Sequence, residues 1–419
     1  MPSSTRAAGA TSTVMRHRMM WGAVALLWIA YFLNYIDRQV VFSIFPALKS
    51  ELGFTNTQLG LTGSVFTWVY SLCMVISGRA ADLFRRDRLI VGSLGLWSLA
   101  TLGTSLSGSV SSFLLWRAAM GVTESLYVPA ALSLIASLHG PATRSRALGI
   151  HMTAQIAGIT AGGWYGGWAA DHIGWRSGFA ILAAAGVTYA IVLLGSFRML
   201  PKVRSDRKQA HSSSGQVFGS ICYNGLLIAF FAYCVMLWML YAWLPNFIYE
   251  RYHLSMTDSG FTATVYLQGS TAVGILTGAF FADRIAARVR AVRFYLVGAG
   301  VLFSAPFAWL AFESQSLLIL KLASIGFGMF GGWLMANIFA AGYDVIAKEN
   351  YGLGAGVLNL CGGLAGGTAV FLAGYFKQSV GIANLMFFAS ALAAASGILL
   401  IVIARFRFPK QDAATEYAN

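Results

Sequence analysis

The chain has 419 residues, of which 57% are hydrophobic and 11% charged, a composition that excludes an ordinary soluble domain. Lysine and arginine exceed aspartate and glutamate by 14 charges. Such an excess would suit a nucleic-acid partner, but the basic residues gather in alternate connections between apolar stretches. Membrane topology explains that pattern, so we exclude nucleic acid as a partner.

Apolar stretches of about 20 residues recur along the whole chain, and that length crosses a hydrocarbon core of about 30 Å. We therefore predict an all-α integral membrane protein with twelve transmembrane helices. The predicted spans cover residues 20–47, 57–79, 88–108, 112–136, 146–170, 177–197, 219–248, 258–281, 291–311, 316–340, 353–375 and 382–404.

The basic clusters follow the even-numbered spans, as Arg85, Arg86 and Arg88 do after the second. By the positive-inside rule both termini are cytoplasmic, in a plasma membrane that we take to be a bacterial inner membrane. The predicted domains are a disordered cytoplasmic tail (1–18), a six-helix bundle (19–198), a cytoplasmic linker (199–218), a second six-helix bundle (219–405) and a cytoplasmic tail (406–419).

The two halves of the chain resemble each other weakly. Gly60-Leu61-Thr62 opens the second span, and Gly260-Phe261-Thr262 opens the eighth. The fifth and eleventh spans both carry glycines at four-residue spacing, which lets neighbouring backbones approach closely. Corresponding features in two halves predict a pseudo-symmetric transporter whose site lies at the midplane between them.

Four ionisable residues interrupt these apolar spans: Asp37 and Arg38 in the first, Arg117 and Glu124 in the fourth. A charge at mid-bilayer costs roughly 2.5–3.5 kcal/mol even on lenient scales, so such residues usually face a cavity and serve a function. A carboxyl group such as Glu124 is a natural proton carrier, because burial and approaching cations alter its protonation. A guanidinium such as that of Arg38 suits a substrate carboxylate.

The Gly78, Asp82 and Arg86 loop, the Arg117-x-x-x-Gly121 stretch and the glycine-rich fifth span resemble the signatures of the major facilitator superfamily over essentially the whole chain. The resemblance implies two pseudo-symmetric six-helix bundles and makes that loop a gating element. The loop departs from the usual pattern at Leu83, Arg85 and Asp87.

Within that superfamily, four local matches resemble the anion:cation symporter family, which includes sugar-acid and sialin-like carriers. They are residues 34–38 (NYIDR), 69–73 (VYSLC), 117–124 (RAAMGVTE) and 356–359 (GVLN). Spinster-like lipid transporters share the Asp-Arg pair and the arginine and glutamate of the fourth span. These lipid transporters are the main alternative to the anion:cation symporter family as the group that the chain resembles.

The family resemblance implies that Glu124 and Asp37 exchange protons, that Arg117 is the charge partner of Asp37, and that Arg38 binds the substrate carboxylate. Two alternatives stay open. Arg117 could form a permanent pair with Asp37 or Glu124 that only locks the helices. Arg38 could snorkel or neutralise Glu124.

Further positions match residues that line the site in sugar-acid carriers: Tyr35, Tyr70, Gln155 and Asn359. His151, one helical turn before Gln155, is a candidate for coupling, and Asn337 is a candidate for binding. Phe339 stands where those carriers have a tryptophan, and this departure favours a smaller or more aromatic carboxylate.

We therefore predict a proton-coupled symporter of a small organic anion such as a sugar acid or other monocarboxylate, working by alternating access. The alternative is a spinster-like exporter of lysolipids or sphingolipids. Motifs for nucleotide, zinc or serine-hydrolase chemistry are missing from the sequence, so we expect no enzyme activity, no metal and no cofactor beyond protons as coupling ion. A monomer in the lipid bilayer is expected for the superfamily.

Overall fold

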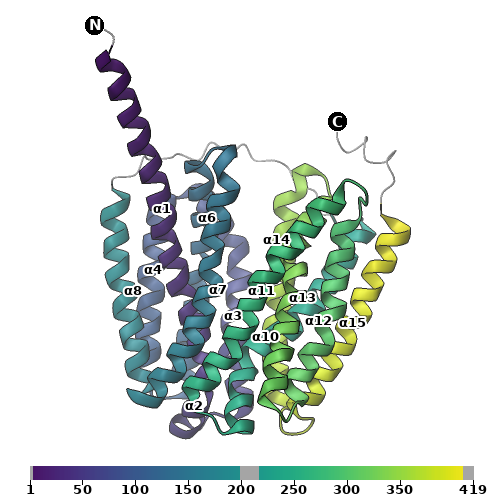
Figure 1. Cartoon of the computed structure of the whole chain (residues 1–419). Helices are drawn as coiled ribbons and strands as arrows, with labels where there is room; N and C mark the ends of the chain where they lie inside the picture. Colours follow the sequence, from purple (N-terminus) through teal and green to yellow (C-terminus); the bar gives the residue numbers. More distant parts are fainter. Residues whose placement is uncertain (1–2, 199–216, 409–419) are drawn as a thin grey trace.

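A computed structural model of the chain describes residues 3–198 and 217–408. Most of the predicted linker (199–216) and the tail from residue 409 lie outside these ranges. The described residues form two groups of long helices that stand side by side, with both chain ends at the same end of the molecule (Figure 1). We call that end the terminal side and the opposite end the far side.

The first group holds the N-terminal half of the chain. Its helices are α1 (Ser3–Ser43), α2 (Phe45–Leu52), α3 (Asn56–Leu83), α4 (Arg86–Ser105), α5 (Val110–Ser125), α6 (Tyr127–Leu138), α7 (Pro141–His172) and α8 (Trp175–Phe197). The second group holds α10 (Ile221–Tyr252), α11 (Met256–Ala286), α12 (Val292–Glu313), α13 (Leu317–Tyr343), α14 (Tyr351–Phe376) and α15 (Ile382–Arg407). A short 3-10 turn, η1 (Lys348–Asn350), precedes α14.

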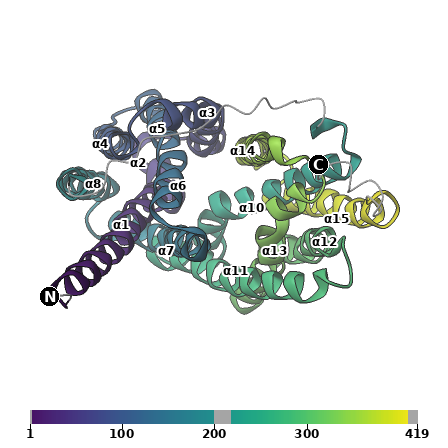
Figure 2. The same ribbon diagram turned by 90° about the horizontal axis from the view of Figure 1, so that it is seen from above.

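Each of the twelve predicted spans corresponds to one of these helices or, for the fourth span, to α5 followed by α6. Nine stretches within the described ranges are long and apolar enough to cross a membrane by composition alone. α3, α4 and α7 fall outside that set but stand in the same bundle (Figure 2). α4 is less apolar because its terminal-side turns carry Arg86 and Arg88, and α7 because it is rich in glycine and contains His151 and Gln155.

Two of the predicted boundaries differ from the structure. α1 begins at Ser3, whereas the sequence predicts a disordered tail over residues 1–18. The stretch from Ser3 to Trp21 contains no proline, the residue that most strongly breaks a helix, and several alanines, which favour one. At the other end α1 stops at Ser43 and a separate helix, α2, starts beside Pro46.

The fourth span consists of α5 and α6, which meet at Leu126, a residue whose backbone keeps helical angles (φ −72°, ψ −23°). Pro129 follows three residues later, and proline cannot donate the backbone hydrogen bond that would continue the ladder back to Ser125. Pro129 therefore marks the boundary between the part of the span that carries Arg117 and Glu124 and the part that reaches the terminal side.

The two halves repeat each other in backbone detail. Gly174 precedes α8 and Gly381 precedes α15, and both have φ of +81°, a conformation that favours glycine. These are the last long helices of each half, so the internal repeat that the sequence predicts extends to the turns.

Glycines on α7 and α14 line the contacts that the sequence predicts. On α7, Gly158 and Gly162 face α1, while Gly163 faces Thr264 and Gly260 of α11. On α14, Gly362 and Gly366 face Phe230 and Trp238 of α10, while Gly363 and Gly367 face Ser71 and Trp68 of α3. α7 and α14 are thus the helices through which each half packs against its own neighbour and against the other half.

Contacts between the halves concentrate toward the far side. Ser64 of α3 donates to the carbonyl of Gly367 on α14 at 2.6 Å, and a Cβ on Gly60 would lie 2.8 Å from the carbonyl oxygen of Val370. Toward the terminal side the ribbons of the halves diverge (Figure 1). There a Cβ on Gly78, Gly352 or Gly356 would meet no atom within 4 Å.

Candidate functional site

The centre of the N-terminal half holds a buried ion pair between α1 and α5. Nε of Arg38 donates to Oε2 of Glu124 at 2.6 Å, with 8% of Arg38 and none of Glu124 exposed. Nη2 of Arg38 and Oε1 of Glu124 have no hydrogen-bond partner among the described residues. The ion pair therefore leaves hydrogen-bonding capacity unused on both the guanidinium and the carboxylate.

Three aromatic rings surround the guanidinium of Arg38. Its Cζ lies 4.2 Å from the ring centroid of Tyr70, 4.9 Å from that of Tyr35 and 5.1 Å from that of Phe66. Ring faces attract cations, so this cage helps to hold a charge that is buried in the membrane. Tyr35 and Tyr70, two of the residues predicted to bind substrate, are thus both brought to Arg38.

Arg117 does not form the ion pair that the sequence predicts with Asp37. Its Nε donates to the carbonyl of Thr62 at 3.2 Å, its Nη1 lies 3.0 Å from the sulfur of Met120, and no carboxylate within the described ranges is at ion-pair distance. Glu124 is instead paired with Arg38, because neighbouring residues on a helix project about 100° apart and Arg38 is the one that faces α5.

Asp37 projects to another side of α1, toward α4. It is 4% exposed, lies beside Thr101 and Trp97, and is within electrostatic range of Arg117. Its Oδ1 and both side-chain polar atoms of Asn34, one turn earlier, have no partner in the described part of the chain. Buried polar groups normally find partners, so this region has unused capacity to bind a polar ligand or a proton.

The C-terminal half approaches this region through α10 and α11. Gln39, next to Arg38, donates to the backbone carbonyl of Tyr241 at 3.2 Å, and the Tyr241 hydroxyl accepts from Gln268 at 2.9 Å. Sequence reasoning missed Tyr241 and Gln268, because a tyrosine and a glutamine within apolar helices carry no distinctive pattern. It also missed Phe66, although Phe66 lies one helical turn before Tyr70 on the same face of α3.

The remaining candidates are more dispersed. His151 is fully buried and stacks on Tyr31 at 4.7 Å, and Gln155 is half-buried one turn further along α7. Asn337 is buried between α13 and α11, where it donates to the carbonyls of Gly278 and Trp333 at 3.3 and 2.9 Å. Asn359 is exposed on α14 and donates to its own helix at Ala355. Of the predicted substrate-binding residues that the structure describes, Tyr35 and Tyr70 are the two in contact with the guanidinium of Arg38.

The predicted gating loop lies at the terminal side. Arg86 donates to the carbonyl of Ser133 on α6 at 3.3 Å, and Arg85 pairs with Asp87 at 2.6 Å. Gly78 stands clear of other atoms, and the side chain of Asp82 lies outside the described part of the chain. Arg86 thus bonds to a helix of its own half.

Clusters of three or more histidine, cysteine or acidic side chains that could hold a metal do not occur in residues 3–198 and 217–408. The four cysteines are free. The chemistry available at the centre is therefore that of two arginines, two carboxylates and their aromatic neighbours.

A family model described as the Major Facilitator Superfamily matches residues 27–370. The chain belongs to the major facilitator superfamily. It is thus a multi-pass membrane transporter and not an enzyme, as the sequence predicts.

Two curated relatives align with nearly the whole chain. The chain is 26% identical to a probable galactarate/D-glucarate transporter of Bacillus subtilis (strain 168), over 97% of both chains. It is also 26% identical to a probable sulfoacetate transporter of Cupriavidus necator, over 92% of both. The first of these names agrees with the predicted resemblance to sugar-acid carriers, and the second names another small organic anion.

A solved structure of a bacterial homologue of the human lysosomal transporter Spinster, in an inward-facing and unoccupied conformation, matches with a TM-score of 0.76. The match covers 96% of this chain and 98% of that one at 20% identity. At such low identity it shows the shared fold.

Proposed function

We propose that this transporter is a proton-coupled symporter of a small organic anion, such as a sugar acid or another monocarboxylate. The observation that carries the proposal is the buried Arg38–Glu124 pair, in which one guanidinium nitrogen and one carboxylate oxygen are unpartnered. The names of the curated relatives, which include a D-galactonate transporter of Escherichia coli O6:H1 at 22% identity, support an acidic substrate.

The pair suggests how anion and proton are coupled. A substrate carboxylate takes the forked donors of Arg38 and displaces Glu124, because both carboxylates compete for one guanidinium. The displaced Glu124 is then a buried, unpaired carboxylate, and a proton neutralises it. Asp37 is the second proposed proton acceptor, with Arg117 nearby. The loaded, neutral site crosses the membrane at lower cost than a charged one.

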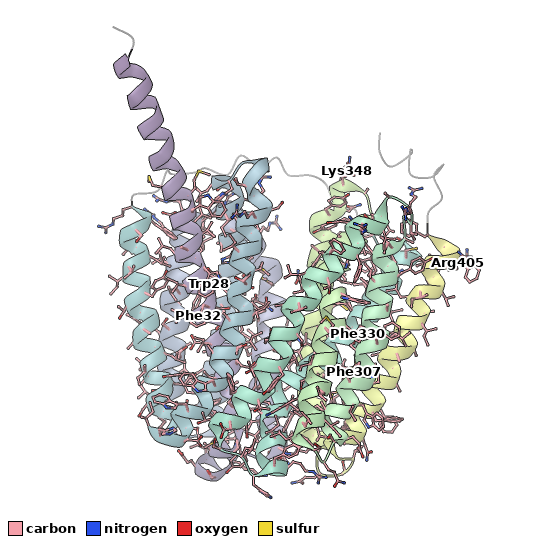
Figure 3. All side chains as sticks on the ribbon, in the orientation of Figure 1. Trp28, Phe32, Phe307, Phe330, Lys348 and Arg405 are labelled. Atoms are coloured by element: carbon pink, nitrogen blue, oxygen red, sulfur yellow. The ribbon has the colours of Figure 1, made fainter. Side chains whose placement is uncertain are left out.

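The orientation follows from charge distribution. Lys348 and Arg405 lie at the terminal side (Figure 3), as do Arg85 and Arg88. By the positive-inside rule we place this side and both termini in the cytoplasm of a bacterial inner membrane. The tight contacts of the far side then close the external route, and the diverging terminal side faces inward.

A lysolipid exporter is the second candidate, and the fold shared with the Spinster homologue is the observation that favours it. That fold also accommodates soluble anions, so the similarity does not distinguish the two. A thermal-shift screen of detergent-purified protein against D-galactonate, D-glucarate, sulfoacetate and a lysophospholipid at two pH values separates them. Stabilisation by the lysolipid alone would replace the anion proposal.

Proteoliposome uptake tests the coupling. We expect D-galactonate, D-glucarate or sulfoacetate to accumulate when the external medium is more acidic than the lumen. Glu124→Gln should retain exchange of internal for external anion and lose proton-driven accumulation. The matched control is Glu313→Gln, at the exposed end of α12, which should behave like the wild type. Equal proton-driven accumulation by Glu124→Gln and the wild type would remove the assignment.

A further inference from the structure

One aromatic ring lies between the two buried arginines. The ring centroid of Phe66 is 5.1 Å from Cζ of Arg38 and 4.7 Å from Cζ of Arg117, and Phe66 is 2% exposed. Among the described residues, no other ring is recorded in contact with two cations. Phe66 is therefore shared by the two positive charges of the site.

The two arginines depend on this ring to different degrees. Arg38 has the carboxylate of Glu124 and the rings of Tyr35 and Tyr70 as well. Arg117 has a carbonyl, a thioether and Phe66, and no other ring is recorded over it within the described ranges. A buried guanidinium without a carboxylate is costly, so the ring face is a main source of stabilisation for Arg117.

Arg117 has an alternative partner within reach. Glu124 lies seven residues further along α5, on the same face and about 10 Å away along the axis, a gap that two long side chains can close. Both Glu124 and Asp37 are already within electrostatic range of the Arg117 guanidinium. The guanidinium of Arg117 instead contacts the carbonyl of Thr62, the sulfur of Met120 and the ring of Phe66.

We infer that Phe66 is a positioning residue that retains Arg117 so that Glu124 stays available to Arg38. With the ring in place, arrival of an anion at Arg38 releases Glu124 to accept a proton. When the ring attracts cations less strongly, Arg117 pairs with the released Glu124, which then no longer needs the proton. This inference rests on the proposed function, because it assigns the ring a part in coupling the anion to the proton.

Fluorinated phenylalanines introduced at position 66 test the electronic role, because successive fluorines weaken the ring face toward cations and change its shape little. The probe is D-galactonate in proteoliposomes, with D-glucarate and sulfoacetate as further probes. We expect the proton-driven accumulation ratio to fall stepwise from one to three fluorines, by about tenfold in total, which corresponds to about 1.4 kcal/mol of lost cation–π attraction. Counterflow exchange should stay within about twofold of the wild type.

The chain offers a matched control in Phe113. It is fully buried in the same half and packs edge-on against Phe54 and Trp175, and no cation is recorded over its ring within the described ranges. Fluorination there should leave accumulation unchanged. Phe66→Tyr, which keeps a ring, should couple better than Phe66→Leu, which keeps apolar bulk.

A double-mutant cycle on thermal stability tests the contact independently of transport. Phe66→Leu should destabilise the wild type more than it destabilises Arg117→Met, because the second background lacks the cation that the ring holds. The inference would be overturned if the effects of Phe66→Leu and Arg117→Met on stability were additive. It would also be overturned if fluorination at position 66 changed the accumulation ratio no more than fluorination at position 113. Neither result would contradict symport. If the wild type shows no acid-driven uptake of any of the three anions, the proposed function fails, and the cycle still decides whether the ring holds Arg117.

Discussion

Asp171, at the end of α7, caps the first turn of α11 in the opposite half of the molecule. Its Oδ2 accepts from the backbone nitrogen of Thr257 at 2.8 Å and from the Thr257 hydroxyl at 2.6 Å, while Oδ1 accepts from the nitrogen of Met256 at 3.4 Å. A carboxylate at a helix N-terminus satisfies free amides and complements the helix dipole. One half thus completes the secondary structure of the other on the far side.

Loss of this cap should favour opening of the far side. Asp171→Ala removes hydrogen bonds typical of an N-cap, which stabilise a helix by about 1 kcal/mol. We therefore expect the fraction of molecules whose far side is open to rise about fivefold. Spin labels at Ile173 and Tyr249, each 37% exposed and in different halves, report the separation by electron paramagnetic resonance in a variant without the native cysteines.

Asp258→Ala is the control for that experiment, because Asp258 interacts with Ser255 of its own half. It should weaken the start of α11 without changing the distance between the halves. An unchanged distance distribution in Asp171→Ala would show that the cap contributes nothing to closure.

Gly260→Ala should prevent close packing of α7 against α11. A Cβ at Gly260 would overlap the carbonyl oxygen of Gly163, and backbone cannot move aside as a flexible side chain can. Overpacking of this kind costs about 1–3 kcal/mol, so uptake should slow and the labels at Ile173 and Tyr249 should separate. The control is Gly269→Ala on the same helix, where the added Cβ would meet no atom within 4 Å, so uptake should not change. Equal uptake and equal label distances in the two variants would contradict the role of the contact at Gly260.

Arg38→Ala should abolish anion binding and also lower stability. Removal of the guanidinium leaves Glu124 buried without its partner, at a cost of about 3–5 kcal/mol. The double variant Arg38→Ala/Glu124→Gln should recover most of the melting temperature and none of the binding, measured by D-galactonate-induced thermal shifts. Wild-type affinity in either variant would refute the carboxylate clamp.

The charge balance of the site predicts the stoichiometry of transport. Asp37 and Glu124 cancel Arg38 and Arg117, so a monoanion needs one proton for the loaded site to remain neutral. D-galactonate uptake should therefore move no net charge, and the dianion D-glucarate should bring two protons. Uptake driven by membrane potential alone, with no pH gradient and with valinomycin setting the potential, would contradict this balance.

Composition and periodicity were sufficient to predict the twelve spans, the two halves and the glycine-lined contacts, because these follow from apolar length and residue size. They also located four charged residues at the centre. They could not decide which arginine pairs with Glu124, since that depends on the rotation of α1 against α5. The sequence left open a pair of Glu124 with Arg117 and a pair of Glu124 with Arg38, and the structure forms the second, between residues that are distant in sequence.

The missed residues share a physical cause. Phe66 and Asp171 are ordinary in sequence, one a membrane phenylalanine and the other a carboxylate at a helix end. Their importance comes from what other helices bring to them: a second arginine for Phe66, and the start of α11 for Asp171. Contacts between helices that are distant in the sequence leave no recognisable pattern in the residues around either partner.

Pro129 is a weak point in an otherwise continuous fourth span, because it cannot donate the backbone hydrogen bond to Ser125. Arg117 and Glu124 both belong to α5, so their spacing is set by one uninterrupted helix, while α6 contacts Arg86 through the carbonyl of Ser133. Bending of the span at Pro129 would therefore move α6 without altering the distance between the two charges. One membrane span thus holds both the charged residues of the site, on α5, and the contact with the terminal-side loop, on α6.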